Sequence, residues 1–327
     1  MTESLPELPE RIEQILLGGP RRYTRREAAA AAGMSLDEAS ALWHALGFAH
    51  TSDDDVAFTD EDVAALRIVA TLVEHEVVDR SAQTSMTRMV GQTMSRLAEW
   101  QAGLLASLIL ERPDVLAREG DVAQFVEEVV PLLERVHAFA WRRHLAAFAG
   151  RALSAGADSP ARETVVGFAD MTGYTALTRQ LTQAQLATML DTFEAAASDI
   201  VAENRGRIVK TLGDEVLFVA DQPVDGARIA LQLVDHAAAS SVLPELRAGV
   251  AAGEVLMRYG DVAGAVANIA SRLTMLARPG TVLVDRAMAA ELDGRPEFTL
   301  QRLRQVAVRG YRHLEPWVLR WAGEGRS

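Results

Sequence analysis

The spacing of apolar and polar positions changes character about halfway along the chain. In the first half, apolar residues recur at intervals of three and four, as on one face of an α-helix, and no stretch alternates like a strand. The pattern predicts helices over Ala64–Val78, Met86–Leu110 and Val122–Phe148. Thr59, followed by three acidic residues, is typical of a helix start. We therefore expect residues 1–150 to form an all-helical domain.

A shift in composition marks the end of this half. The segment Gly150–Arg162 is rich in Gly, Ala and Ser and contains one Pro, which is typical of a linker. We place the linker at residues 151–162 and a second domain at residues 163–322.

The second half alternates short apolar runs with longer helical patterns. Strands are expected over Thr164–Ala169, Arg207–Leu212, Val216–Ala220, Leu246–Glu254 and Thr281–Val284, and helices over Leu181–Asn204, Val224–Ala239 and Val262–Ala277. Two of these runs flank Gly213-Asp214, which indicates a hairpin. The order β-α-β-β-α-β predicts a ferredoxin-like sandwich with appended elements, so that the whole chain is of the α+β class.

Composition narrows the class of protein. The 327 residues suffice for two domains, and 49% apolar with 24% charged residues is ordinary for a globular protein. The longest strongly apolar stretch, around Leu104–Leu110, is far shorter than the roughly 20 residues that span a bilayer, and no signal peptide is evident. Cysteine is absent, which excludes disulfides and thiolate metal sites. We expect a cytoplasmic protein without membrane association.

Charge bears on nucleic-acid binding. The formal net charge is −12, and most of it falls within residues 1–150. A domain that binds nucleic acid usually carries the opposite sign. The acidic half therefore argues against bulk DNA binding, although it leaves room for a small basic patch.

Two aspartates follow apolar strands at points where they can converge. Asp170 ends the first strand and precedes a turn with Gly173, whose backbone N–H groups suit phosphate oxygens. Asp214 lies at the tip of the hairpin, which adjoins the first strand in a ferredoxin-like sheet. Converging carboxylates are ligands that Mg²⁺ prefers. Either aspartate alone is equally compatible with a plain turn.

A third feature lies on a later helix. Asn268 and Arg272 are four residues apart, hence on one face, among small and apolar neighbours. Polar side chains on such a face require partners. For Arg272 alone, a structural salt bridge would be enough.

Together these positions resemble the catalytic domain of the class III nucleotidyl cyclases, over roughly Glu163 to Trp321. The resemblance implies a role for seven positions: two Mg²⁺ or Mn²⁺ ions on Asp170, Asp214 and the backbone of Met171, the base on Lys210 and Asp261, the ribose on Asn268, and the transition state on Arg272. It also implies that metal-binding and base-binding residues come from different subunits, so that a homodimer holds two shared sites.

The choice of base follows from hydrogen bonding. Lys210 can only donate and an ionised Asp261 can only accept, which matches N1 and the amine of adenine, whereas guanine presents the reverse. The resemblance therefore implies an adenylate cyclase that converts ATP to 3′,5′-cyclic AMP and pyrophosphate. Glu215 after Asp214 is also similar to the diguanylate cyclase signature, but Leu212 replaces its first glycine.

One detail of the catalytic half, the residue that contacts the triphosphate, stays open at this point. Either Arg309 or Arg312 is a candidate contact for the triphosphate. The sequence does not choose between them.

The N-terminal half has a resemblance of its own. The segment from Tyr23 to Asp60 resembles a MerR-like winged helix-turn-helix. The segment is either a packing module or a DNA-binding segment. In the second case, the whole chain would be a non-catalytic nucleotide-binding regulator. The overall arrangement looks like actinobacterial cyclases with a helical, autoinhibitory N-terminal domain that responds to pH. This likeness implies that residues 1–150 form an all-helical regulatory domain.

Candidate sensors follow from this second likeness. His137 and His144 are seven residues apart on one predicted helix and are candidates for binding a regulatory proton. A Met-rich apolar tract suits either a lipid pocket or a dimer core; its members are Met86, Met89, Met94, Leu104, Leu105 and Leu108.

Overall fold

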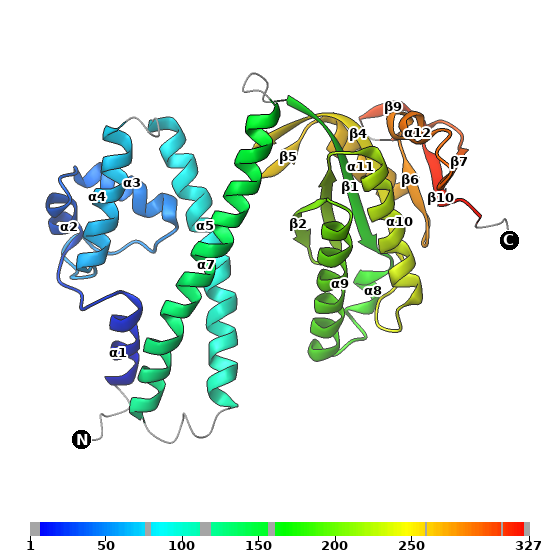
Figure 1. The fold of residues 1–327 in the computed structure, drawn as a ribbon. Coiled ribbons are helices and arrows are strands. Elements are labelled where there is room, and N and C mark those ends of the chain that lie inside the picture. Colours follow the sequence, from blue (N-terminus) through cyan, green and yellow to red (C-terminus); the bar gives the residue numbers. More distant parts are fainter. Residues whose placement is uncertain are drawn as a thin grey trace. The chain divides into compact units, whose positions relative to one another are not determined.

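The computed structural model describes residues 7–75, 80–111, 119–155, 161–258, 260–308 and 310–323. The chain divides into two compact units, Met1–Ala155 and Gly156–Ser327, and each is described by itself. Figure 1 traces both units in the order of the sequence.

Helices make up the described part of the N-terminal unit, apart from one β-bridge between Tyr23 and Phe58. They are α1 (Glu7–Leu16), α2 (Arg25–Ala31), α3 (Leu36–Leu46), α4 (Asp60–Glu74), α5 (Arg80–Leu110) and α7 (Glu119–Ala155). This confirms the helical class predicted for the first half. No described helix combines the length and the apolarity that a membrane crossing requires.

Capping residues define where the short helices begin. Thr24, Ser35 and Thr59 each form a capping box, in which the side chain accepts from the third helical amide and an acidic side chain accepts from the cap. The small core behind these helices includes Trp43, whose ring stacks on Phe58 at 4.3 Å between centroids. The predicted start at Thr59 is thus confirmed.

The two long helices extend beyond their predicted limits. Helix α5 begins at Arg80 rather than Met86, and α7 continues to Ala155. The first residues assigned to the linker are therefore helical, because the Ala- and Leu-containing stretch 151–155 favours a helix despite Gly150. Residues 156–160 lie outside the described part of the chain.

The second unit is built on a twisted mixed sheet. Its strands are β1 (Ala161–Met171), β2 (Arg207–Leu212), β3 (Glu215–Ala220), β4 (Leu246–Arg258), β5 (Asp261–Ala263), β6 (Val282–Val284), β7 (Phe298–Arg302) and β10 (Trp317–Trp321). They are ordered β2-β3-β1-β4-β6-β10-β7, with β5 paired to β4. The β2-β3-β1-β4 portion is the predicted ferredoxin-like sheet, which confirms the fold class.

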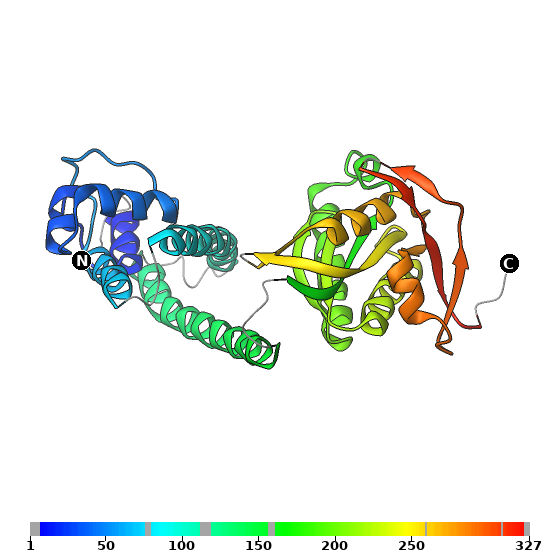
Figure 2. The same ribbon diagram turned by 90° about the horizontal axis from the view of Figure 1, so that it is seen from above.

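Helices cover both faces of this sheet (Figure 2). One face packs on α9 (Gln183–Glu203), α10 (Pro223–Ala239) and α12 (Arg286–Leu292), and the other on α11 (Ala265–Leu276). Side chains of β1 alternate between these faces, since Ala169 packs with α9 and α10 whereas Phe168 packs with α11. This alternation places Asp170 on the α11 face.

Sequence analysis misplaced one helix and omitted several elements. The helix expected over Val262–Ala277 begins at Ala265, because Asp261–Ala263 pairs with β4 as β5. Gly264, with φ of 131°, separates the two elements. In the second unit, the described elements that were not predicted are β5, α8 (Tyr174–Leu177), α12, β7, β8 (Val306–Val308), β9 (Tyr311–Leu314) and β10.

Candidate active site

Three charged residues lie side by side on neighbouring strands. Asp170 in β1 is directly opposite Glu215 in β3 and Arg247 in β4. Arg247 donates from Nε (2.8 Å) and Nη2 (2.6 Å) to one carboxylate oxygen of Asp170. The Asp170 side chain is only 14% exposed, so this ion pair is partly desolvated.

The β2–β3 hairpin brings the second aspartate to the same end of the sheet. Gly213 and Asp214 form its two-residue loop, and φ of 64° at Gly213 suits such a tight turn. The amide of Met171 donates to the carbonyl oxygen of Asp214 at 2.9 Å. The structure thus brings together Asp170, Asp214 and the backbone of Met171.

Electrostatics connects these carboxyl groups. Burial raises the pKa of Asp214, a backbone hydrogen bond opposes this increase, and the charges of Asp170 and Arg247 have smaller effects that raise and lower the pKa respectively. Burial, followed by the charges of Asp170 and Asp214, raises the pKa of Glu215 to about 7. The site therefore holds more carboxyl groups than one nearby arginine neutralises.

This donor set fits a hard divalent cation. Oxygen ligands on a partly buried, electronegative cluster are what Mg²⁺ and Mn²⁺ prefer. Within the described residues, no group of three or more Asp, Glu, His or Cys side chains has the disposition of a complete metal site. Asp170, Asp214 and the backbone of Met171 would hold the ions only together with further oxygens, as is usual where Mg²⁺ binds along with a phosphate-bearing substrate.

A second pair of predicted residues meets on β2 and β5. Lys210 Nζ lies 2.7 Å from Asp261 Oδ2. Burial alone would raise the pKa of Asp261, but hydrogen bonds from Lys210 and from the Val262 amide lower it. Asp261 is therefore ionised at neutral pH. Both side chains remain accessible, at 38% and 52% exposure.

Helix α11 carries the last two predicted residues. Asn268 is exposed and Arg272 is half-buried, with Arg272 Nη1 3.2 Å from the sulfur of Met275. Among the described contacts, no hydrogen bond or ion pair joins either residue to Asp170 or Asp214. The salt bridge considered for Arg272 is likewise absent from the described ion pairs.

A close backbone approach fixes the height of α11 above the sheet. A Cβ on Gly249 of β4 would lie 2.2 Å from the amide nitrogen of Thr274 and 2.4 Å from the carbonyl oxygen of Ala270. Only glycine allows this spacing. Thr274 also donates to the Ala270 carbonyl (3.0 Å), which ties the same turn together. The position of Asn268 and Arg272 thus depends on Gly249.

Two further expectations concerned the turn after Asp170 and the arginine that contacts the triphosphate. Two amides of the predicted phosphate-binding turn are already bonded, Met171 to Asp214 and Thr172 to the carbonyl of Glu245. Arg309 and the side chain of Arg312 lie outside the described residues.

Sequence reasoning missed Arg247. The only available signal was one arginine near the start of a strand that begins with small and apolar residues, and such an arginine ordinarily faces solvent.

Known proteins resemble both units. Residues 158–320 match the family described as the adenylate and guanylate cyclase catalytic domain. A protein from Streptomyces coelicolor named adenylate cyclase is 40% identical, over 94% of this chain and 88% of its own length. A protein from Mycobacterium tuberculosis named pH-sensitive adenylate cyclase is 31% identical, over 86% of this chain and 73% of its own.

A solved structure, the adenylyl cyclase CyaB from P. aeruginosa, is 19% identical with a TM-score of 0.44 and covers 51% of this chain and 98% of its own. The relatives above share sequence with this chain across both of its units. The chain belongs to the class III adenylate and guanylate cyclase family, with its catalytic domain in the second unit.

Proposed function

We propose that this protein is an adenylate cyclase that converts ATP to 3′,5′-cyclic AMP and pyrophosphate. The observation that carries the choice of base is the contact between Lys210 and Asp261, at 2.7 Å. One side chain only donates and the other, ionised, only accepts, which complements N1 and the amine of adenine. Guanine would leave both groups unpaired or repelled, and each group that a bound base buries in this way would cost about 1–3 kcal/mol.

The remaining residues have complementary roles in the reaction. Two Mg²⁺ or Mn²⁺ ions on Asp170, Asp214 and the backbone of Met171 would lower the pKa of the ribose 3′-hydroxyl and neutralise phosphate charge. Arg247 adds a cation beside these carboxylates, where a polyphosphate would lie. Asn268 orients the ribose, and Arg272 stabilises the charge that develops on the α-phosphate.

We propose further that the site is shared across a homodimer. Asn268 and Arg272 have no described contact with the carboxylates of their own chain, as expected if they serve the partner's site. Large apolar side chains next to the site are exposed, namely Leu212 (56%) on the hairpin and Met275 (59%) on α11. A second chain on this face would bury them and complete two equivalent sites.

The N-terminal unit is proposed to regulate the catalytic unit. The tract proposed as lipid pocket or dimer core is exposed on α5 at several positions, including Met94 (49%) and Leu104 (43%). An exposed tract favours a dimer core over a closed lipid pocket. His137 contacts Gln101 of α5 at 2.8 Å between ring and amide nitrogens, whereas His144 is exposed. His137 therefore lies at a contact between the two long helices.

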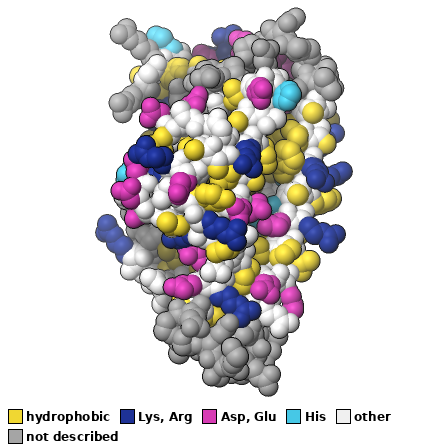
Figure 3. All heavy atoms as spheres, turned by 90° about the vertical axis from the view of Figure 1, so that its left-hand side faces the viewer, with side chains coloured by type: hydrophobic (Ala, Val, Ile, Leu, Met, Phe, Trp, Pro, Cys, Tyr) yellow, Lys and Arg dark blue, Asp and Glu magenta, His cyan; other side chains and the backbone are white. Residues whose placement is uncertain are grey.

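The rival function, a DNA-binding regulator, has less support. Helix α3, the recognition helix of the helix-turn-helix resemblance, begins with Asp37 and Glu38 and carries no Lys or Arg. Arg22 and Arg25 near it pair with carboxylates. On the face shown in Figure 3, basic side chains are interspersed with acidic ones rather than gathered in one patch. Such a surface is unsuited to a DNA backbone.

Turnover of purified full-length protein tests the proposal directly. ATP or GTP would be supplied with Mg²⁺ or Mn²⁺ between pH 5 and 8, and cyclic nucleotide and pyrophosphate would be measured. We expect cyclic AMP from ATP and far less product from GTP. Absence of cyclic AMP under every condition would favour the rival, and equal use of GTP would refute the argument about the base.

A further inference from the structure

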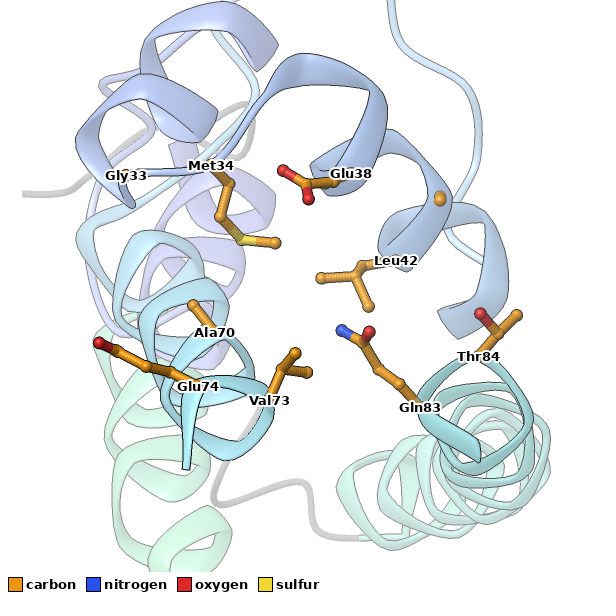
Figure 4. Close-up of a pocket in the computed structure, with 10 residues that line it drawn as sticks. Gly33, Met34, Glu38, Leu42, Ala70, Val73, Glu74, Gln83 and Thr84 are labelled. Carbon is orange, nitrogen blue, oxygen red and sulfur yellow. The ribbon is translucent and has the colours of Figure 1, made fainter. Parts of the chain in front are cut away.

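Two depressions flank α3 in the N-terminal unit, and they differ in chemistry. The first, of about 340 Å³, lies between α3, α4 and the beginning of α5. Figure 4 shows Leu42, Val73 and Gln83 around it, and the carboxylates of Glu38 and Glu74 also line it. The second, of about 640 Å³, lies between the C-terminal end of α3 and the middle of α5. We call this second depression the α3–α5 groove.

The α3–α5 groove is basic although the half of the chain that holds it is acidic. Arg88, Arg96 and His44 line it, and none of its lining residues is Asp or Glu. Within the described part of the chain, neither Arg88 nor Arg96 has an ion pair or a side-chain hydrogen bond. By contrast, Arg21 and Arg22 of the same unit each pair with a carboxylate. The groove therefore has a local positive potential without an internal counter-charge.

The spacing of its side chains follows from helix geometry. Arg88, Gln92 and Arg96 recur every fourth residue on α5 and so lie along one side of the helix. Eight residues correspond to about 12 Å between the first and the last along the axis. Gln92 and the nearby Ser95 add neutral hydrogen-bonding groups between the two guanidinium groups.

The wall of the groove is fixed by a close helix contact. A Cβ on Gly91 would lie 2.3 Å from the carbonyl oxygen of Leu46, so the backbones of α3 and α5 meet at this point. Gly91 is buried. The position of Arg88 and Arg96 relative to His44 is therefore set by backbone packing rather than by mobile loops.

We propose that the α3–α5 groove binds a small polyphosphate anion and is a ligand site separate from the catalytic residues. Guanidinium groups match phosphate oxygens in paired, charge-assisted hydrogen bonds, and two of them along one helix suit an extended chain of phosphates. Such an anion has two sources that share this chemistry: free polyphosphate, including pyrophosphate, and the phosphate chain of a nucleotide.

Binding to the full-length protein in EDTA tests this site. Sodium tripolyphosphate would be titrated by calorimetry at physiological salt into the wild type, the double variant R88A/R96A and the control R135A/R142A. The control removes the same charge from exposed positions of α7. We expect the wild type and the control to bind equally and R88A/R96A to lose affinity about tenfold or more. Equal affinity in all three proteins, or equal loss in both variants, would overturn the proposal.

Two further titrations test whether the bound anion is a polyphosphate. R88K/R96K retains charge without the planar fork and should fall between the wild type and R88A/R96A. Citrate, an anion without phosphate, should bind more weakly than tripolyphosphate, and equal binding would overturn the assignment to polyphosphate. Titrations with pyrophosphate and with ATP distinguish the two sources. Unchanged melting temperatures would show that the variants are folded.

Discussion

The two units of the chain differ in how much of their apolar surface one chain buries. The catalytic unit encloses large side chains such as Phe193, Phe218 and Leu319 between its sheet and its helices. In the N-terminal unit, the long helices leave large side chains exposed, including Trp100 (64%) and Trp141 (62%). Exposed apolar area on this scale is typical of an interaction surface.

A hydrophobic core that is complete within one chain does not by itself mean that the active site is complete within one chain. The catalytic unit has its core within one chain, yet no described hydrogen bond or ion pair joins the proposed reactive residues Asn268 and Arg272 to Asp170 or Asp214. In the described part of the N-terminal unit, large apolar side chains of α5 and α7 are not covered by the rest of the chain. In the proposed homodimer, a partner chain would complete the active site of the catalytic unit and cover exposed apolar side chains of the N-terminal unit.

The largest effect is expected from the carboxylates of the catalytic unit. Asp170→Asn or Asp214→Asn should lower turnover by about a thousandfold, because each removes a charged ligand of the proposed metal ions. Asp199→Asn, on the exposed surface of α9, should leave turnover unchanged. The measurement is the rate of cyclic AMP formation at saturating metal. Near wild-type rates in either site variant would contradict the proposed role.

The same substitution, glycine to alanine at a close backbone contact, can be made in each unit and the effects compared. Gly249→Ala should displace α11, lowering turnover about tenfold and stability by about 1–3 kcal/mol, because the new Cβ would overlap Ala270 and Thr274. Gly91→Ala should destabilise the N-terminal unit by a similar amount with a smaller effect on turnover.

The matched control is Gly103→Ala, since nothing lies within 4 Å of a Cβ there. This change should stabilise α5 by up to about 1 kcal/mol. Thermal unfolding and turnover of the three variants give the comparison. If Gly249→Ala left turnover unchanged, α11 would not position reactive groups.

Removal of the N-terminal unit should have a moderate effect. A chain that begins at Gly156 should differ several-fold in turnover from the full-length protein, because the missing unit is proposed to set the activity of the catalytic unit. The cut is best placed after Ala155, where α7 ends. An equal rate per active site, in dimeric samples of both proteins, would refute a regulatory role.

The smallest effect on turnover is expected at Asp285, which caps α12 by accepting from the Met288 amide at 2.9 Å. Burial raises the pKa of Asp285 to about 6. A carboxyl whose pKa is raised by folding stabilises the fold while protonated, and this contribution is lost as pH rises from about 4 to 6. Asp285→Asn keeps a cap that does not ionise.

Asp285→Asn should therefore gain stability relative to the wild type over that pH window, by about 3 kcal/mol at most, because one pKa unit corresponds to about 1.4 kcal/mol. Denaturant unfolding of both proteins between pH 4 and 7 measures the difference. A difference that does not change with pH would show that Asp285 has an ordinary pKa.

Much of this arrangement follows from sequence patterns, and the exceptions have physical reasons. Apolar periodicity predicted the helices and the β-α-β-β-α-β order because it reflects which face of each element is buried. It missed β5 because Val262 and Ala263 continue directly into the apolar pattern of α11. Arg247 escaped notice because register, which pairs it with Asp170 some 77 residues away in the chain, is a tertiary property.

Sharing of the site between two chains is tested most directly by mixing two inactive variants. Asp170→Ala lacks a proposed metal ligand and Arg272→Ala lacks the proposed transition-state group. If each site takes its carboxylates from one chain and Arg272 from the other, half of the randomly mixed dimers contain one intact site. An equimolar mixture should then recover about a quarter of the wild-type rate. No recovery in a mixture shown to contain heterodimers would contradict the shared site.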